Sequence, residues 1–282
     1  MKLGILISQV RLEEKLIFAA AEARGLRVEK IFDRDLILDL ENPAFAEVDL
    51  VLDRSLVHSR AEYTLRYLES AAIPTVNSYR ATITCDNKFL TTTVLFEAGI
   101  PTLPTLVAYT PDAALKAIET IGYPAVLKPP VGSWGRLLAK INDRDAAEAV
   151  LEHKEILGSY HHSIYYIQKY IEKKGGDIRA FVVGDRVIGA SYRSSDHWIT
   201  NVARGATTSI CEVTPAIEEI ALRAAHAVQG EILGVDLVDT PDGYRVIEIN
   251  TGAEFKGLQG AVEGAGIDVP GEIVDYLLRQ KS

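Results

Sequence analysis

The sequence predicts an α/β protein whose C-terminal part is α+β, with a small doubly wound domain at the N-terminus. Short apolar strands alternate with amphipathic helices through the first 80 residues, which is typical of a parallel sheet. From residue 178 onward several strand-like segments follow with one helix between them, which indicates an α+β arrangement. A chain of 282 residues is also too long for one ordinary core. We therefore expect three subdomains, over residues 1–87, 88–171 and 172–282.

The first subdomain is predicted to alternate strands at 3–8, 48–53 and 74–77 with helices at 13–24 and 61–72. In the first helix, apolar residues such as Ile17 and Ala21 lie on one face, and Gly25 follows as a C-cap. No GxGxxG pattern follows the first strand, so dinucleotide binding is not expected there.

The second subdomain begins with a predicted helix at 88–98, which Gly99 ends, and an extended stretch at 100–109. Thr110-Pro111 is an N-cap followed by a proline at the first helical position, so a helix is expected to start there. The remaining predicted elements are a strand at 124–128, a glycine-containing turn at 132–138, a helix at 144–157 and a strand at 163–171.

In the third subdomain strands are predicted at 179–183, 186–192, 235–239 and 244–249. Thr214-Pro215 is expected to open the helix between them. Asp242-Gly243 lies between two strand-like runs and indicates a hairpin that pairs the last two strands.

Charge and composition exclude several classes of function. The formal net charge is −9, which argues against non-specific nucleic-acid binding because such proteins need a basic surface. No run of 18 apolar residues is present, so no membrane span is expected. The two cysteines, Cys85 and Cys211, exclude a disulfide scaffold and indicate a reducing compartment, so a cytoplasmic location is expected.

Oxygen ligands follow the last two predicted strands. Glu248 and Asn250 are two positions apart and therefore share a face, and the hairpin would bring Asp236 close to both. Three hard oxygen ligands suit Mg²⁺, which binds one or two carboxylates together with substrate phosphates. A solvated polar face of the sheet is the alternative interpretation.

A lysine and a glycine-rich turn indicate a phosphate site. Lys128 ends a buried strand, and Gly132 and Gly135 follow within a few residues, where backbone N–H groups can approach a phosphate. A commonplace turn is the alternative, but the acidic cluster downstream favours a nucleotide-binding loop.

Two further segments are candidates for ligand contact. The end of the strand at 165–171 can hold an adenine ring, and Asp177 can accept from a ribose hydroxyl; a strand followed by a charged turn is the alternative. Residues 192–205 include Arg193 and Arg204, which can bind phosphate or carboxylate with two hydrogen bonds. His197 has no Ser or Cys nucleophile pattern around it and is interpreted as a positioning residue.

Taken together, these motifs resemble the ATP-grasp superfamily over essentially the whole chain, nearest to the branch of the ribosomal-protein glutamate ligase. Within that branch the motifs at 132–138 (GSWGRLL), 197–205 (HWITNVARG) and 254–256 (EFK) resemble the LysX type of ligase from lysine biosynthesis. Members of that type join α-aminoadipate to the C-terminal glutamate of a small acidic amino-group carrier protein. The Lys256-Gly257 continuation also resembles the sister ligases of arginine biosynthesis, which use glutamate, so dual specificity is open.

The resemblance implies a role for each matching position. The residues expected to bind ATP are Lys88, Lys128, Gly132, Ser133, Trp134, Gly135, Arg136, Leu137, Leu138, Gln168, Lys169, Tyr170, Ile171, Asp177, Arg179 and Asn201. Arg193 and Asn201 are expected at the transferred phosphoryl group as catalytic residues. Asp236, Glu248 and Asn250 are expected to hold two Mg²⁺ ions. The residues expected to contact the substrates are Arg193, Ser194, His197, Trp198, Arg204, Glu254, Phe255 and Lys256.

The implied reaction is an ATP-dependent ligation through an acyl phosphate, carried out by a homodimer or homotetramer. An acidic partner is compatible with the net charge, because residues 168–204 contain seven lysines and arginines against four acids. Two alternatives remain: a glutamate ligase that modifies another protein tail or a cofactor, and a nucleotide-binding regulatory protein without turnover.

Overall fold

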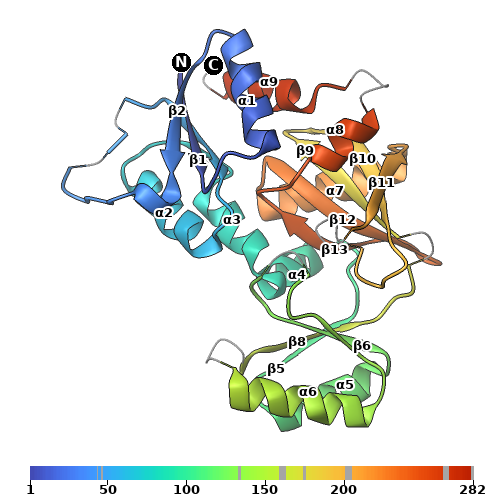
Figure 1. The fold of residues 1–282 in the computed structure, drawn as a ribbon. Coiled ribbons are helices and arrows are strands. Elements are labelled where there is room, and N and C mark those ends of the chain that lie inside the picture. Colours follow the sequence, from blue (N-terminus) through green and yellow to red (C-terminus); the bar gives the residue numbers. More distant parts are fainter. Residues whose placement is uncertain are drawn as a thin grey trace.

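The computed structural model describes residues 1–42, 44–45, 47–132, 135–158, 163–173, 176–200, 205–262 and 267–280. Figure 1 shows three layered parts: a parallel sheet with the N-terminus, a small sheet backed by two helices, and a larger antiparallel sheet. In the part of the chain that is described, no helix is long and apolar enough to cross a membrane.

The N-terminal part is a doubly wound parallel sheet with strand order β2-β1-β3-β4. Alternate residues of β1 face opposite layers, so Leu3 and Ile5 pack on α1 and the C-terminal helix α9, while Leu6 packs on α2. The carboxyl ends of β1 and β3 therefore lie between the N-termini of α1 and α2. The elements are β1 (Lys2–Ile7), α1 (Leu12–Ala23), β2 (Arg27–Phe32), η1 (Asp33–Asp35), β3 (Leu50–Arg54), α2 (His58–Ser70), β4 (Thr75–Val76) and α3 (Tyr79–Asp86).

The central part is a four-stranded antiparallel sheet, order β5-β8-β6-β7, covered on one face by α5 and α6 (Figure 1). The expected cap is confirmed, because the Thr110 side chain accepts a hydrogen bond from the Ala113 backbone N–H. The elements are α4 (Lys88–Glu97), β5 (Thr105–Ala108), α5 (Pro111–Ile121), β6 (Ala125–Lys128), β7 (Ala139–Ile141), α6 (Arg144–Leu157) and β8 (Tyr165–Lys169).

The C-terminal part is a five-stranded antiparallel sheet, order β11-β10-β9-β12-β13. The predicted hairpin is confirmed: β12 and β13 pair from Gly234↔Asn250 to Thr240↔Gly243, with Pro241 and Asp242 in the turn. The elements are β9 (Asp177–Val183), β10 (Arg186–Ser194), β11 (Thr207–Cys211), α7 (Pro215–Val228), β12 (Ile232–Thr240), β13 (Gly243–Asn250), α8 (Lys256–Val262) and α9 (Val269–Arg279).

The elements that were not expected from the sequence include β2, α3, β11, α8 and α9. β2 is a half-exposed edge strand in which charged residues interrupt the apolar pattern. α3 contains several β-branched residues, which disfavour a helix, yet the Ser78 side chain caps it by accepting from the Ala81 N–H. α9 returns the chain to the N-terminal part, where it packs on α1 (Figure 1). The N- and C-terminal parts therefore share one core.

Candidate active site

A cavity of about 820 Å³ lies where the three parts of the chain meet. Its walls come from the N-termini of α1 and α2, from the ends of β6 and β8, and from the inner face of the C-terminal sheet. Because each wall carries charged side chains, the cavity is suited to a large polar ligand.

The central part contributes two lysines and the glycine turn. Lys128 is buried, and its Nζ donates to Gln168 Oε1 at 2.7 Å. Lys88 Nζ donates to the Gly132 carbonyl at 2.7 Å and lies 3.7 Å from Glu248 Oε1. Burial lowers the pKa of Lys128 to about 8. An anionic phosphate beside it would offset that cost and keep the ammonium charged.

A buried chain of ion pairs crosses strands β10, β9 and β12, which we call the strand network (Lys173, Asp177, Arg179, Arg193 and Asp236). The antiparallel register places Arg193 opposite Asp177 and Asp236 opposite Arg179. Arg193 Nε donates to Asp177 Oδ1 at 2.7 Å, and its Nη2 lies 2.9 Å from Asp236 Oδ2. Arg179 donates through Nε and Nη2 to both oxygens of Asp236, at 2.7 and 2.8 Å.

The outer end of the strand network is held by a lysine and a hydroxyl group. Lys173 Nζ donates to Asp177 Oδ2 at 2.8 Å and to Thr200 Oγ1 at 2.9 Å, and Thr200 also donates to Asp177. Burial raises the pKa of Asp236, but the charges of Arg179 and Arg193 outweigh it and bring that pKa to about 2. Three cations therefore meet two carboxylates, so the network has a net positive charge towards the cavity.

Two carboxylates and one amide on the β12–β13 hairpin are candidate metal ligands. Asp236 and Glu248 are direct cross-strand partners. Both residues line the cavity, and so does Asn250. No group of three or more His, Cys, Asp or Glu side chains forms a metal site within the described residues, so an amide would complete the set. The Asn250 amide nitrogen is buried without a partner there. These hard oxygen donors fit Mg²⁺. Asp236 has three contacts with guanidinium N–H groups, which leaves about one of its four acceptor positions for a metal.

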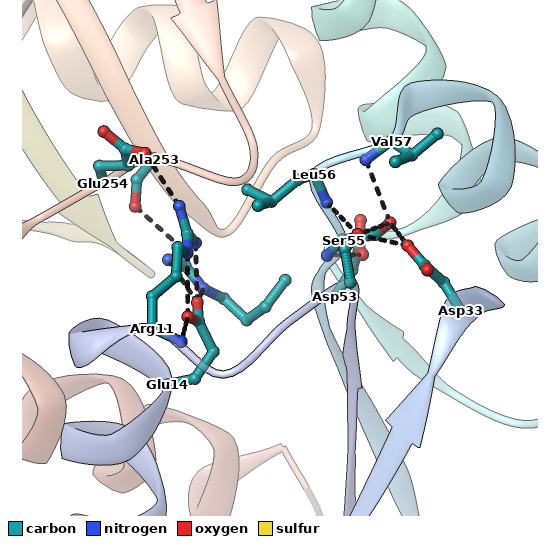
Figure 2. A network of polar contacts seen from close by, with 11 residues as sticks. Arg11, Glu14, Asp33, Asp53, Ser55, Leu56, Val57, Ala253 and Glu254 are labelled. Carbon is teal, nitrogen blue, oxygen red and sulfur yellow. Dashed lines mark hydrogen bonds and ion pairs between the residues drawn. The ribbon is translucent and has the colours of Figure 1, made fainter. Parts of the chain in front are cut away.

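A second buried chain of ion pairs joins the N-terminal part to the segment after β13 (Figure 2). We call it the interface network (Arg11, Glu14, Arg54 and Glu254). Arg11 donates to Glu14 through Nη2 at 2.8 Å and Nε at 3.0 Å, and through Nη1 to Glu254 at 2.9 Å. Arg54 lies 3.3 Å from Glu14 Oε1 and donates to the Ala253 carbonyl at 2.9 Å.

The carboxyl ends of β1 and β3 present further titratable side chains. Burial raises the pKa of Asp53 to about 7, although the Ser55 backbone N–H donates to its carboxylate. His58 Nδ1 lies 2.8 Å from Asp86 Oδ1, and that carboxylate raises the pKa of the imidazole. In Figure 2, Asp33 accepts from Ser55 beside the start of α2. The crevice at this edge of the parallel sheet is a usual position for ligands in doubly wound folds.

Comparison with known proteins identifies the fold. Residues 85–277 match a RimK-like ATP-grasp domain, and residues 3–84 match a LysX preATP-grasp domain. The chain belongs to the RimK-like ATP-grasp family. It is similar to a glutamate–LysW ligase ArgX of Sulfurisphaera tokodaii, at 35% identity over 280 residues and 98% of each chain. It is also similar to an α-aminoadipate–LysW ligase LysX of Saccharolobus solfataricus, at 34% identity over 253 residues, 87% of this chain and 90% of that one.

A solved structure agrees with this family. A RimK domain ATP-grasp protein of Sphaerobacter thermophilus superposes with a TM-score of 0.84 at 27% identity, covering 98% of this chain and 99% of that one. The predicted ATP-grasp fold with an N-terminal α/β domain is therefore confirmed. The relatives are named as ligases, so this family member is an enzyme and not a regulatory protein.

Most of the residues selected from the sequence line the one cavity. Those brought together are Lys88, Lys128, Gly132, Gly135, Leu138, Gln168, Lys169, Tyr170, Ile171, Asp177, Arg179, Arg193, Trp198, Asp236, Glu248, Asn250, Glu254 and Lys256. Some have structural partners as well: Lys169 Nζ donates to the Ile121 carbonyl, and the Tyr170 ring lies under Lys140 Nζ at 3.8 Å. Their individual roles toward ATP, metal and substrate remain predictions for this ATP-grasp chain.

Other selected residues lie outside the cavity walls. Arg136, Leu137, Ser194, His197 and Phe255 are not among the lining residues. Phe255 is fully buried and packs edge-on against Phe181, so it supports its segment from behind. Ser133, Trp134, Asn201 and Arg204 lie outside the described residues.

The sequence interpretation missed the charged side chains of the N-terminal wall, which are Arg11, Glu13, Asp53, His58 and Asp86, and the buried pair Glu14 and Arg54 behind that wall. Some of these residues could have been selected from the sequence pattern. Asp53 and Arg54 come at the end of a buried strand, where a doubly wound fold places its ligands. Arg11 and Glu14 flank the start of a helix with capping-box spacing.

Proposed function

We propose that this chain joins the amino group of α-aminoadipate to the C-terminal glutamate γ-carboxylate of a small acidic amino-group carrier protein, using ATP and an acyl phosphate. Glutamate is the alternative amino acid, alone or alongside α-aminoadipate. The relatives named for both amino acids are nearly equal in identity to this chain, at 35% and 34%.

One observation carries the proposal: residues of all three parts that are expected to bind phosphate, metal and substrate line a single cavity. Lys88 and Lys128 are suited to ATP phosphates. Glu248 lies 3.7 Å from Lys88 and is the cross-strand partner of Asp236 in the strand network. The segment that bears Glu254 and Lys256 closes the third side. Such an arrangement lets a phosphoryl donor, a carboxylate and an amine meet without a protein nucleophile.

The first step transfers a phosphoryl group to the carrier's γ-carboxylate. A carboxylate oxygen forms a bond to the γ-phosphorus, the bond to the bridging oxygen breaks, and ADP leaves. Lys88, Lys128 and the positive strand network compensate the negative charge that gathers on the transferred group. Arg193 and Asn201 are proposed at that group.

The second step forms the amide. The amine nitrogen attacks the acyl phosphate carbon, inorganic phosphate leaves, and the nitrogen gives up a proton. The turn at 132–138 is proposed to cover the reacting groups and keep water from hydrolysing the acyl phosphate.

Asp236, Glu248 and Asn250 would hold Mg²⁺, and we propose two ions. When bound, these ions supply Lewis-acid stabilisation of phosphate charge. The Asp236 side chain is already held in place by two guanidinium groups.

We also propose which residues contact the nucleoside and the substrates. Gln168 to Ile171 would frame the adenine, with Asp177 near the ribose. Arg193, Ser194, His197, Trp198, Arg204 and residues 254–256 would contact the carrier tail or the amino acid. A homodimer or homotetramer, a cytoplasmic location and the division at 87/88 and 171/172 are part of the same proposal.

A ligation assay tests the function. The chain is incubated with ATP, Mg²⁺ and the carrier protein, with either α-aminoadipate or glutamate, and ADP release and the mass of the carrier are followed. The expected result is ADP release and a mass increase of one amino-acid residue with at least one of the two. Unchanged carrier mass with both amino acids would contradict the proposed substrates.

A further inference from the structure

Arg11, which precedes the first residue of α1, pairs with two different carboxylates. Its inner edge, Nε and Nη2, is bonded to both oxygens of Glu14, whose side chain is 0% exposed. Its outer Nη1 contacts only the carboxylate of Glu254 among the described residues, at 2.9 Å, and that side chain is 39% exposed. The guanidinium is therefore fixed from behind and presents one edge to a carboxylate that is partly in solvent.

The charges behind Arg11 explain why its position is stable. Glu14 is shared by Arg11 and Arg54, and Arg54 is 2% exposed on its side chain. One inner carboxylate thus faces two guanidinium groups, and the outer carboxylate of Glu254 supplies the remaining negative charge. Since a buried cation needs a partner, another carboxylate of suitable size can replace Glu254 at the same edge.

The position of Arg11 fits an amino acid. Arg11, Leu12 and Ser55 line the cavity at the crevice between β1 and β3, together with residues 251–254. An amino-acid substrate has only its carboxylates, besides the reacting amine, for charged recognition. A single arginine in a recessed wall can hold such a group and leave the amine free to turn toward the acyl phosphate.

We propose that Arg11 binds a carboxylate of the amino-acid substrate, and that Glu254 occupies this position until the substrate arrives. This assignment rests on the proposed ligase function. Glu14 and Arg54 are positioning residues, because they fix the guanidinium without contacting the ligand.

Comparing hydroxylamine with the amino-acid substrate separates binding of the amino acid from formation of the acyl phosphate. Hydroxylamine has no carboxylate and is largely unprotonated at neutral pH, so it traps the acyl phosphate as a hydroxamate without needing Arg11. Arg11→Gln should raise KM for the amino acid about tenfold to a hundredfold, which is the usual loss for one charge-assisted pair. The rate of hydroxamate formation and the KM for ATP should stay unchanged. Arg11→Lys keeps the positive charge but loses the two parallel hydrogen bonds to Glu14, so it should raise the KM for the amino acid less than Arg11→Gln does.

The two monoamides of the accepted amino acid identify the contact. Wild-type kcat/KM should fall for the monoamide that lacks the recognised carboxylate. Arg11→Gln should use that monoamide as well as the parent amino acid, because the interaction is already gone. If the variant discriminates as the wild type does, or if KM rises for the carrier protein and not for the amino acid, the assignment to the amino acid is wrong.

A matched control lies at the other end of the same helix. Arg24 pairs with Asp275 through Nε at 2.5 Å and Nη2 at 2.9 Å, and it does not line the cavity. Arg24→Gln should leave all amine KM values unchanged. If Arg24→Gln raised the KM for the amino acid as much as Arg11→Gln, the role of Arg11 would be structural. A wild-type chain that forms neither hydroxamate nor amide would instead contradict the ligase function itself.

Discussion

Two buried ion networks border the cavity, and they are built in different ways. The strand network lies within one sheet, where its acids and bases are cross-strand neighbours in register. The interface network extends to residues far along the chain, since Arg11 and Glu254 are 243 positions apart. The first is a local consequence of strand pairing. In the second, the Arg11–Glu14 and Arg54–Glu14 pairs form within the N-terminal part, and the contacts to Ala253 and Glu254 require docking of the C-terminal part. The strand network should therefore control chemistry, and the interface network should control docking and recognition.

The largest effect is expected from removing the inner carboxylate of the interface network. Glu14→Gln takes away the carboxylate that faces the buried Arg54, while the Ala253 carbonyl and the Phe255 ring stay beside it. Breaking a buried ion pair typically costs about 3–5 kcal/mol. The free energy of unfolding in urea at neutral pH measures this. A loss below about 1 kcal/mol would show that the two parts dock without the network.

The next effect tests the strand network. Arg193→Lys keeps a positive charge, but one ammonium cannot reproduce the planar fork that bridges Asp177 and Asp236. We expect kcat for ADP release to fall roughly a hundredfold to a thousandfold, as for loss of one electrostatic stabiliser, with the unfolding temperature nearly unchanged.

An exposed arginine provides the comparison for that variant. Arg186 is two-thirds exposed and pairs with Glu272 at 3.3 Å, so Arg186→Lys should leave kcat unchanged. If Arg193→Lys instead loses stability and keeps kcat, the strand network is structural and the contrast between the networks disappears.

The same contrast explains what could be predicted from the sequence. The hairpin signal at Asp242-Gly243 and the two-residue period of strands were enough to bring Asp236 and Glu248 to one face. Arg54 meets Glu14 through the packing of α1 beside β3, and Arg11 and Arg54 meet residues 253–254 through docking of the whole C-terminal part. Neither periodicity nor local spacing contains such a contact. The helix α9, which completes the docking, was itself missed, although Asp268 caps it and Pro270 lies in its first turn.

A pH experiment sharpens the account of the N-terminal wall. The pKa of Asp53 is about 7 in the folded chain against 3.8 as its ordinary value, because the carboxyl group is desolvated. A raised carboxyl pKa means that stability is lost as the pH rises from about 4 to 7, since only the unfolded state ionises freely there. Asp53→Asn should therefore raise the free energy of unfolding by about 2–4 kcal/mol at pH 8 and leave it unchanged near pH 4.

The measurement near pH 4 is the control for the one at pH 8. If Asp53→Asn changed the free energy of unfolding equally at both, the cause would be altered packing, because near pH 4 ionisation of the carboxyl group in the unfolded state contributes little to the free energy of unfolding. A destabilised variant at pH 8 would mean that the ionised carboxylate has a cationic partner in the folded chain.

The smallest effect separates the two carboxylates of the interface network. Glu254 contacts Arg11 through one hydrogen bond and is 39% exposed, so its pair is solvated and screened, and such pairs contribute about 0–1 kcal/mol. Glu254→Gln should lower the free energy of unfolding by less than about 1 kcal/mol, several times less than Glu14→Gln. The effect should shrink further at high salt. Equal losses for the two variants would mean that Glu254 is part of the docking contact and is not free to leave Arg11. In that case the outer edge of the guanidinium would be closed to a substrate carboxylate, so this inexpensive stability measurement also bears on the recognition role of Arg11.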